Sequence, residues 1–408
     1  MAREGVCPLF CRKFLLPFIA LTRAILALGV TQIIGYGTLY YAFGVMAVPL
    51  TADLGVSLPF AFGAFSAALL AGGAVAPVAG RTIDRYGARR VMAWGSAGSA
   101  IALLVLSQAG GAVGLILALI LCEGVAALVL YDAAFAALAQ AAGAARARRA
   151  ITLMTLMGGF ASTLFWPLTH VMNENLGWRE TLLIFAALHV FVCLPLHLTL
   201  PRLSEDTAPA KPGLATAPHF PTLPVARHGK AMLWLAIGFS LGGIVLSALG
   251  AQWVPTLHAL GLTEAAAVAA GTLMGPAQVA VRLLDLFFGV LRHPLGFAIL
   301  SGAALALAFV VLLVAPVGLP AAMVFAALFG VASGSASIVR GTVPLCLFGT
   351  EGYAARLGTL AGWRLATSAA APFALSLSLA GLGANVTLAL ACGIAAGSAL
   401  ALTQVPRR

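Results

Sequence analysis

Residues 58–90 read LPFAFGAFSAALLAGGAVAPVA followed by GRTIDRYGARR, an uncharged apolar stretch that ends in a short loop crowded with arginine. An α-helix needs about 20 mainly apolar residues to cross the hydrocarbon core of a bilayer, and residues 58–79 meet that requirement. The loop at residues 80–90 has the basic character of loops that stay on the cytoplasmic side of a membrane. The segment predicts a transmembrane helix with a cytoplasmic end, and its pattern recurs along the whole chain.

The composition makes the bilayer the main solvent of the chain. Of its 408 residues, 62% are hydrophobic and only 9% are charged, and the mean hydropathy is +1.04. A soluble domain carries about 25% charged residues, so a soluble protein is excluded. The net charge of +11 comes largely from loops between apolar stretches, and it is therefore evidence of membrane topology and not of a nucleic-acid partner.

Apolar stretches of spanning length predict an all-α membrane protein with twelve transmembrane helices. They are expected near residues 24–50, 58–79, 91–109, 112–141, 151–173 and 180–200, and then near residues 231–258, 264–289, 294–315, 319–347, 358–380 and 385–404. A polar, proline-rich stretch between the two sets predicts a flexible linker. The predicted domains are an N-terminal segment (1–23), a six-helix bundle (24–200), the linker (201–230), a second six-helix bundle (231–404) and a tail (405–408).

Basic residues fall on alternate loops, and this bias predicts the orientation in the membrane. The basic loops include residues 80–90 and 146–149, and the linker and the tail share their side. Both termini are therefore expected in the cytoplasm, with the protein in the cell (inner or plasma) membrane. The first apolar segment is too long for the core of a signal peptide and is expected to stay attached as the first helix.

The two halves of the chain echo each other in sequence. The pattern Gly-x4-Pro-x5-Gly occurs at residues 44–55 and again at 250–261, and VAGRTID (78–84) parallels VAVRLLD (279–285). Chance similarity between helices rich in alanine and glycine is the alternative explanation. Two pseudo-symmetric six-helix bundles are the architecture of many secondary transporters, which bind substrate between the halves near the bilayer midplane.

The loop from Gly80 to Arg90 resembles the signature loop between helices two and three of the major facilitator superfamily. It has the glycine, the acid four positions later, the following arginine, the second glycine and the final basic pair. The alternative is a basic loop that only sets topology. The resemblance implies that Asp84 caps helix eleven and contacts nearby arginines, which holds the halves together while the cavity faces outward. The implied gate residues are Gly80, Asp84, Arg85, Gly87, Arg89 and Arg90.

Within that superfamily, the chain is loosely similar to monocarboxylate and oxalate-formate porters. The similarity rests on Arg282 in helix eight and on the basic turn at residues 146–149. The porter pattern has an acid four positions before the helix-eight arginine, where this chain has Gln278, and the acidic motif of helix one is missing. The resemblance implies a small organic anion as substrate, and it leaves proton coupling at that position in doubt.

No motif for ATP hydrolysis or for other catalysis is present. None of Lys13, Lys211 and Lys230 closes a GxxxxGK[ST] loop, and the HExxH and GxSxG motifs do not occur. The six cysteines show no spacing typical of a metal site. The protein is therefore expected to be no enzyme, to use no cofactor or metal, and to transport its solute either passively or driven by a gradient.

Charged residues inside membrane spans are costly, so they are functional candidates by default. Six stand out: Glu123, Asp132, Arg282, Asp285, Arg340 and Arg364. Glu123 and Asp132 lie nine positions apart, about 900° of rotation in one continuous helix, so they are expected on opposite faces. Asp132 is expected to form an ion pair with Arg340, which lies at a matching depth. Glu123 could carry a proton for coupling or could be a protonated carboxyl bonded to a neighbouring helix.

Two interpretations of the arginines stay open. Arg282 and Asp285 could simply neutralise each other on one face of helix eight. Alternatively, Arg282 could join Arg340 or Arg364 in binding the carboxylate of a substrate, because a guanidinium group suits that geometry.

Helix one carries a polar stripe formed by Gln32, Tyr36 and Tyr40, which recur every four residues. The stripe is expected to line the substrate cavity, with packing between helices as the alternative. His170, His189 and His197 are interpreted as packing or interfacial residues and not as ligands.

The sequence thus predicts an ATP-independent transporter of a small solute, an organic anion such as a monocarboxylate, carried alone or with protons by alternating access. Export of a drug-like or toxic compound is one alternative. A sensor or receptor that has the same fold but transports nothing is another. The chain is expected to work as a monomer in the lipid bilayer.

Overall fold

The computed structural model describes residues 8–201, 221–288 and 293–407, with most side chains from residue 19 onward. Twelve helical segments of the described chain are long and apolar enough to cross a membrane, and the described residues contain no strand. This confirms the predicted all-α fold. Parts of the predicted N-terminal segment (1–7), linker (202–220) and tail (408) lie outside the described residues.

The first six spans form the N-terminal bundle. Its elements are α1 (Pro8–Tyr36), the π-helical turn η1 (Gly37–Tyr41), α2 (Ala42–Leu54), α3 (Leu58–Tyr86), α4 (Ala88–Ser107), α5 (Gly111–Ala126), α6 (Tyr131–Gly158), α7 (Ala161–Leu176), α8 (Trp178–Leu188), the π-helical turn η2 (His189–Cys193) and α9 (Leu194–Leu198).

The last six spans form the C-terminal bundle. Its elements are η3 (Val225–Arg227), α10 (His228–Ala259), α11 (Glu264–Gly271), α12 (Met274–Phe288), α13 (Pro294–Val314), α14 (Leu319–Phe348), α15 (Tyr353–Ser368), α16 (Ala371–Leu382) and α17 (Ala384–Thr403). Each bundle has its own apolar core, built around Phe185 in the first and Phe325 in the second.

The ends of the helices follow from local chemistry. Ser57 caps α3 by accepting a hydrogen bond from the backbone N–H of Phe60 at 3.3 Å. Gly87, with φ of +83°, makes the tight turn between α3 and α4 that a residue with a side chain rarely adopts. Gly143, with φ of +66°, divides α6 into the end of the fourth span and the start of the fifth.

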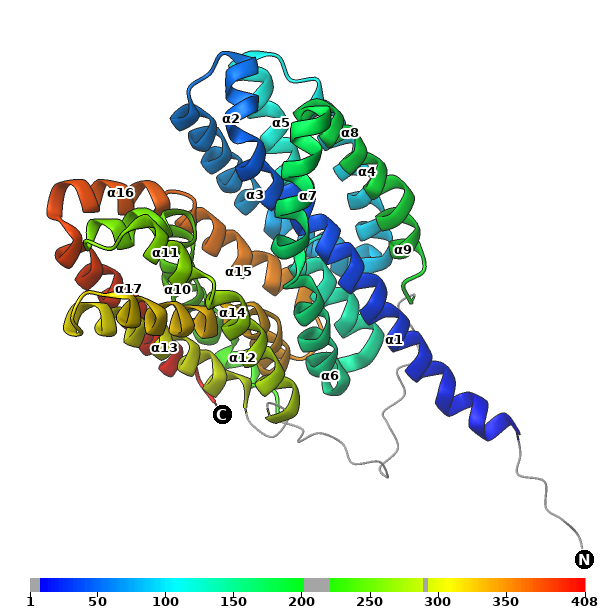
Figure 1. Cartoon of the computed structure of the whole chain (residues 1–408). Coiled ribbons are helices and arrows are strands. Elements are labelled where there is room, and N and C mark those ends of the chain that lie inside the picture. Colours follow the sequence, from blue (N-terminus) through cyan, green and yellow to red (C-terminus); the bar gives the residue numbers. More distant parts are fainter. Residues whose placement is uncertain (1–7, 202–220, 289–292, 408) are drawn as a thin grey trace, which may run out of the picture.

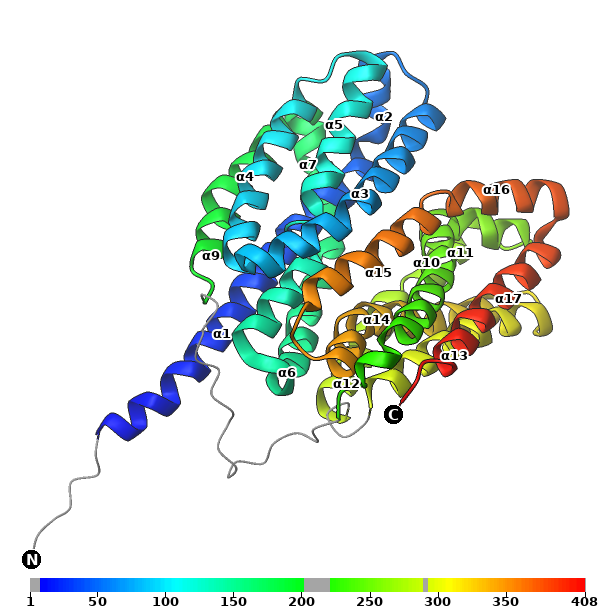
Figure 2. The ribbon, with the colours of Figure 1, turned by 180° about the vertical axis from the view of Figure 1, so that it is seen from behind.

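The two bundles touch at one end of the molecule and separate toward the other. Helix α15 of the C-terminal bundle packs along α3, and α6 packs against α12 and α14. Figures 1 and 2 show the bundles meeting in this region and diverging toward α2 and α16. The closed end carries the loops at residues 80–90 and 146–149, and we call it the basic end.

The fourth span is not the continuous helix that was expected over residues 112–141. Helix α5 stops at Ala126, and α6 begins at Tyr131 after a short non-helical turn. The interruption leaves a backbone carbonyl, that of Val129, without a helical partner, and the side-chain amide of Gln32 donates to it at 2.8 Å. A polar residue on helix one therefore stabilises a break in the fourth span, since an unpaired carbonyl inside a membrane protein is costly.

Candidate functional site

A cavity of about 390 Å³ lies between the two bundles, within the size range of small-molecule sites. Both halves of the chain supply its walls. The N-terminal bundle contributes residues of α1, η1, α3, α5, α6 and α7, and the C-terminal bundle contributes residues of α10, α12, α13, α14, α15 and α17. Its position between the bundles is where a transporter of this architecture would bind a solute.

The wall from the N-terminal bundle is aromatic. The rings of Tyr36 and Tyr131 have their centroids 4.5 Å apart, and Tyr36 lies 6.3 Å from Tyr40 and 6.4 Å from Tyr41. All four tyrosines line the cavity. The wall therefore offers ring faces together with hydroxyl groups that can donate or accept hydrogen bonds.

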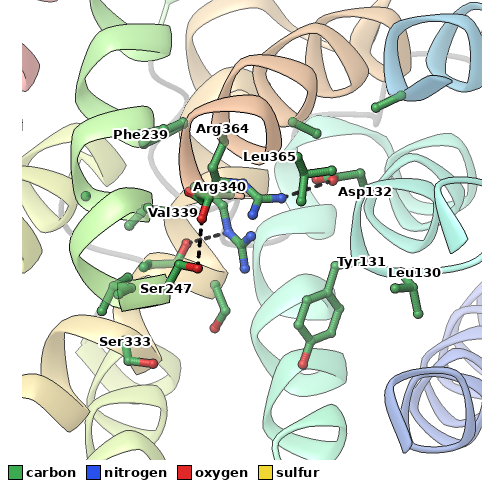
Figure 3. Close-up of a pocket in the computed structure, with 18 of the residues that line it drawn as sticks. Leu130, Tyr131, Asp132, Phe239, Ser247, Ser333, Val339, Arg340, Arg364 and Leu365 are labelled. Atoms are coloured by element: carbon green, nitrogen blue, oxygen red, sulfur yellow. Dashed lines mark hydrogen bonds and ion pairs between the residues drawn. The ribbon is translucent and has the colours of Figure 1, made fainter. Parts of the chain in front are cut away.

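The wall from the C-terminal bundle is basic and rich in hydroxyl groups. Arg282 on α12, Arg340 on α14 and Arg364 on α15 all line the cavity. Figure 3 shows Arg340 and Arg364 side by side and Asp132 facing them from the other bundle. The hydroxyl side chains on this wall include Ser247, Ser301, Ser333, Ser337 and Ser368.

Asp132 pairs with Arg364 and not with Arg340, so the expected ion pair is corrected. The closest pair of atoms, Arg364 Nη2 and Asp132 Oδ2, lies 3.9 Å apart. The Nε of Arg340 donates instead to the carbonyl of Ala336 in its own helix at 3.2 Å, and in the described chain no carboxylate lies within ion-pair distance of Arg340. Equal depth in the two helices did not decide which arginine reaches Asp132.

Glu123 and Asp132 both line the cavity, contrary to the expectation that one helix would hold them on opposite faces. The rotation of about 100° per residue applies only within an unbroken helix. The turn between Ala126 and Tyr131 separates two helices, so the angular relation of a continuous helix does not hold across it. Both carboxyl groups therefore reach the cavity.

The cavity holds an excess of positive charge. Three arginines face two carboxyl groups, so one positive charge remains when both are ionised and two remain when one is protonated. Glu123 has no ion-pair partner in the described part of the chain and is 8% exposed. The arrangement can attract an anion, and it presents one carboxyl group that could gain or lose a proton.

Arg282 reaches from α12 to the N-terminal bundle. Its Nη2 donates to Ser337 Oγ at 3.3 Å, and its Nη1 lies against Gly159, where an added Cβ would come within 1.9 Å of it. The side chain does not neutralise Asp285, which pairs elsewhere. This geometry argues against the first interpretation of Arg282 and leaves it available to the cavity.

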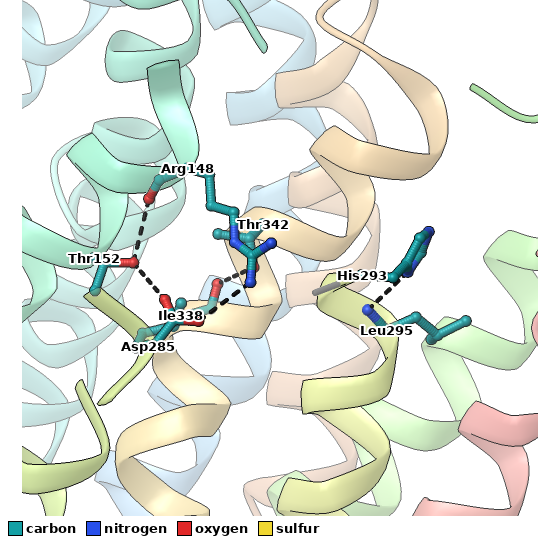
Figure 4. Close-up of polar contacts among 7 residues, drawn as sticks. All are labelled: Arg148, Thr152, Asp285, His293, Leu295, Ile338 and Thr342. Carbon is teal, nitrogen blue, oxygen red and sulfur yellow. Dashed lines mark hydrogen bonds and ion pairs between the residues drawn. The ribbon is translucent and has the colours of Figure 1, made fainter. Parts of the chain in front are cut away.

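Asp285 instead joins the two bundles at the basic end. Its Oδ1 lies 3.2 Å from Arg148 Nη2, and its Oδ2 accepts a hydrogen bond from Thr152 Oγ1 at 2.7 Å. Figure 4 shows Arg148 and Thr152 on α6 enclosing the carboxylate of α12. Only 2% of the Asp285 side chain is exposed, so this contact is buried within the closed end.

Asp84 makes a second contact between the bundles at this end. Its Oδ1 and Oδ2 accept hydrogen bonds from the backbone N–H groups of Ala354 and Ala355, at 3.2 and 2.8 Å, in the first turn of α15. A carboxylate is favourable at the positive end of a helix. In the described chain no ion pair joins Asp84 to an arginine of its own loop, and Arg85 lies over the ring of Tyr86.

Glycines allow α3 and α15 to approach at backbone distance. A Cβ at Gly80 would lie 2.2 Å from the carbonyl oxygen of Ala354, and one at Gly358 would lie 2.2 Å from that of Ala76. Such separations exclude any side chain at either position without movement of the helices. The closed end is therefore sealed by close packing as well as by the carboxylates of Asp84 and Asp285.

Residues 28–374 match the family model described as Major Facilitator Superfamily. The chain belongs to the Major Facilitator Superfamily. No single curated protein sequence matches the chain. Among solved structures, the human organic anion transporter MFSD10 (TETRAN) is similar, with a TM-score of 0.72, 15% identity, and coverage of 95% of this chain and 99% of the other.

Two further structures of the superfamily share the fold. The proton:xylose symporter XylE has a TM-score of 0.68 and 13% identity, with 95% of this chain and 96% of that chain covered. The E. coli fucose:proton symporter FucP has a TM-score of 0.69 and 12% identity, with coverage of 95% and 99%. These likenesses show the fold and leave the substrate of this superfamily member open.

The stripe predicted on helix one is only partly in the cavity of this superfamily member. Tyr36 and Tyr40 line it, whereas Gln32 is fully buried and is not among the lining residues, because its amide supports the break at Val129. Sequence reasoning missed Tyr41 and Tyr131. Tyr41 reaches the cavity through a π-helical turn, which spacing rules for an α-helix do not foresee.

Proposed function

We propose that this protein carries a small organic anion across the membrane by alternating access, without hydrolysing ATP. The observation that supports this most directly is Arg340. It lines the cavity between the bundles, and no carboxylate lies within ion-pair distance of it in the described chain. A charge inside a membrane protein is costly without a partner, so a carboxylate of the substrate is the natural partner for this guanidinium group.

In this conformer the cavity is closed at the basic end. If the basic end faces the cytoplasm, as the distribution of arginine predicts, this conformer opens away from the cytoplasm. Release toward the cytoplasm then requires the contacts of Asp84 with α15 and of Asp285 with Arg148 and Thr152 to break. These groups are polar and become solvated on opening, which keeps the cost of each cycle moderate.

Glu123 is the residue best placed to couple transport to protons. It lies on the cavity wall without an ion-pair partner in the described chain, whereas Asp132 is neutralised by Arg364. Protonation of Glu123 would increase the positive charge that a bound anion meets. A proton and an anion would then be bound together, and symport would follow.

The test is uptake of a panel of radiolabelled aliphatic, aromatic and hydroxylated carboxylates by the purified full chain in liposomes, with and without a pH gradient. We expect saturable uptake of at least one carboxylate. Arg340→Gln should abolish it, and Arg340→Lys should weaken it because lysine lacks the planar fork. Arg179→Lys is the matched control, since Arg179 pairs with the exposed Asp53 outside the cavity.

The outcomes separate this proposal from its alternatives. Flux of neutral or cationic compounds in preference to carboxylates would favour export of a drug-like compound. Binding of a carboxylate without flux would favour a sensor. An uptake that Arg340→Gln leaves unchanged would remove Arg340 from the site. Loss of the pH dependence in Glu123→Gln, with flux retained, would support Glu123 as the coupling group.

A further inference from the structure

Two π-helical turns face each other inside the N-terminal bundle. The turn η1 lies in the first span and η2 in the sixth. Their side chains meet through Thr38 Oγ1 and His189 Nε2, which lie 2.8 Å apart. Thr38 is 3% exposed and His189 is 1% exposed. Turns of this kind are rare within α-helices and frequently occur at functional sites.

The direction of the bond between Thr38 and His189 follows from the other contact of the hydroxyl group. Thr38 Oγ1 donates its single proton to the carbonyl of Ile34 at 2.9 Å, so it accepts the bond from His189 Nε2–H. The Nδ1 of His189 is buried and has no hydrogen-bond partner. A buried histidine with one unsatisfied nitrogen costs free energy, and its described side-chain bond is the one to η1.

The π-helical turn decides which tyrosines share the cavity wall. The backbone N–H of Ala42 bonds the carbonyl of Gly37, five residues earlier, so residues five apart complete the turn. Tyr36 and Tyr41 consequently both line the cavity, with ring centroids 6.4 Å apart. In an uninterrupted α-helix, five residues rotate by about 500°, which would leave these two side chains about 140° apart.

We infer that His189, which does not line the cavity, is a positioning residue for it: its bond to Thr38 holds η1 in the π-helical form and so keeps Tyr41 on the cavity wall beside Tyr36. His189 thereby acts on the site through Thr38 and touches no substrate. The role of the wall in substrate binding rests on the proposed function, but the control of Tyr41 by His189 does not.

The same bundle contains a matched contact that does not involve η1. His197 accepts from or donates to Ser96 Oγ at 2.7 Å, and its other ring nitrogen lies 3.1 Å from Thr31 Oγ1. His197 and Ser96 are fully buried, like the first pair. Removing Ser96 Oγ therefore removes a buried bond between a histidine and a hydroxyl group while leaving the π-helical turns untouched.

The test measures the access of two engineered cysteines to a thiol reagent, in the full chain of 408 residues reconstituted in liposomes. Tyr36→Cys and Tyr41→Cys are made separately, and each is labelled with methanethiosulfonate ethylsulfonate, with the reaction of the parent chain subtracted. In the Thr38→Val background, labelling at position 41 should slow by about tenfold, the effect of losing one buried hydrogen bond. Labelling at position 36, which precedes the turn, should stay unchanged.

Thr38→Ser, made in place of Thr38→Val, and His189→Gln, made with Thr38 retained, should both leave labelling at position 41 at the parent rate, because each keeps the group that forms the bond. His189→Leu should behave like Thr38→Val. Ser96→Ala should lower the melting temperature and leave both labelling rates unchanged. Equal slowing at positions 36 and 41, no slowing at 41, or the same effect from Ser96→Ala would overturn the inference.

Transport provides the second measurement. For a carboxylate that the wild type carries, Thr38→Val should raise KM and leave kcat nearly unchanged, and Thr38→Ser should restore KM. If no carboxylate is carried, the proposed function fails, but the labelling results still decide whether His189 positions Tyr41.

Discussion

The contact of Asp84 with α15 stabilises the conformer in which the basic end is closed. Removing the contact should therefore shift the equilibrium toward the conformer in which the basic end is open. Asp84 accepts two backbone hydrogen bonds across the interface between the bundles, at 3.2 and 2.8 Å. A hydrogen bond to a charged group contributes about 1.5–3 kcal/mol, and the partial exposure of this site favours a total of about 2–3 kcal/mol for the two bonds. Asp84→Ala should therefore raise the ratio of open to closed protein by about 30- to 150-fold.

The assay reads this ratio from the basic end. A cysteine replaces Ala336, which lines the cavity, and a membrane-impermeant thiol reagent is added on the side of the basic end. Because the reagent reaches position 336 from this side only when the basic end opens, the labelling rate reports the open population. Asp84→Ala should raise the rate strongly and Asp84→Asn by less, since the amide oxygen still accepts one bond.

Asp53→Asn is the matched control. Asp53 is also an acid at a helix end, but it is half-exposed and pairs with Arg179 within the N-terminal bundle, so it should not affect the rate. If Asp84→Ala labels position 336 no faster than the parent, the carboxylate does not hold the basic end closed. If Asp53→Asn has the same effect as Asp84→Ala, the response is a general loss of stability.

Three further predictions concern single contacts. Gly80→Ala should destabilise the closed state by about 1–3 kcal/mol, because the added methyl group overpacks against the carbonyl of Ala354. The measurement is faster cysteine labelling from the basic end. Gly124→Ala is the control and should have no effect, since an added Cβ there meets nothing within 4 Å. Gln32→Leu should lower the melting temperature, equivalent to about 1–3 kcal/mol, because it leaves a buried carbonyl unpaired, and it should leave KM unchanged. Asp285→Asn should open the basic end, and this effect should add to that of Asp84→Ala if the two contacts act independently.

The membrane fold could be predicted from the sequence because it depends on the hydropathy of short, continuous segments. Each span needs only a sufficient number of consecutive apolar residues, and backbone hydrogen bonds form within the same segment. Residues 58–79 and their eleven counterparts therefore identified the twelve helices, and the loop from Gly80 to Arg90 identified the superfamily. The sequence also singled out Arg282, Arg340 and Arg364, because charge inside a span is rare enough to be informative.

The partners of those charges depended on contacts between segments far apart in the chain. Asp132 pairs with Arg364 and Asp285 with Arg148, and neither pairing follows from depth or spacing along one helix. The break after Ala126 lets Glu123 and Asp132 line the same cavity. The physical reason is that rotation per residue is conserved only in an unbroken helix.

The sequence by itself thus determined that the protein lies in a membrane, the number of its membrane-spanning helices and its superfamily. These properties depend on hydropathy and charge within short segments of the chain. The tertiary structure alone decided which tyrosines form the cavity wall, which carboxylates seal the basic end, and where helix geometry departs from the α form. Those features arise where one segment satisfies a polar group of another, as Gln32 does for Val129 and His189 does for Thr38.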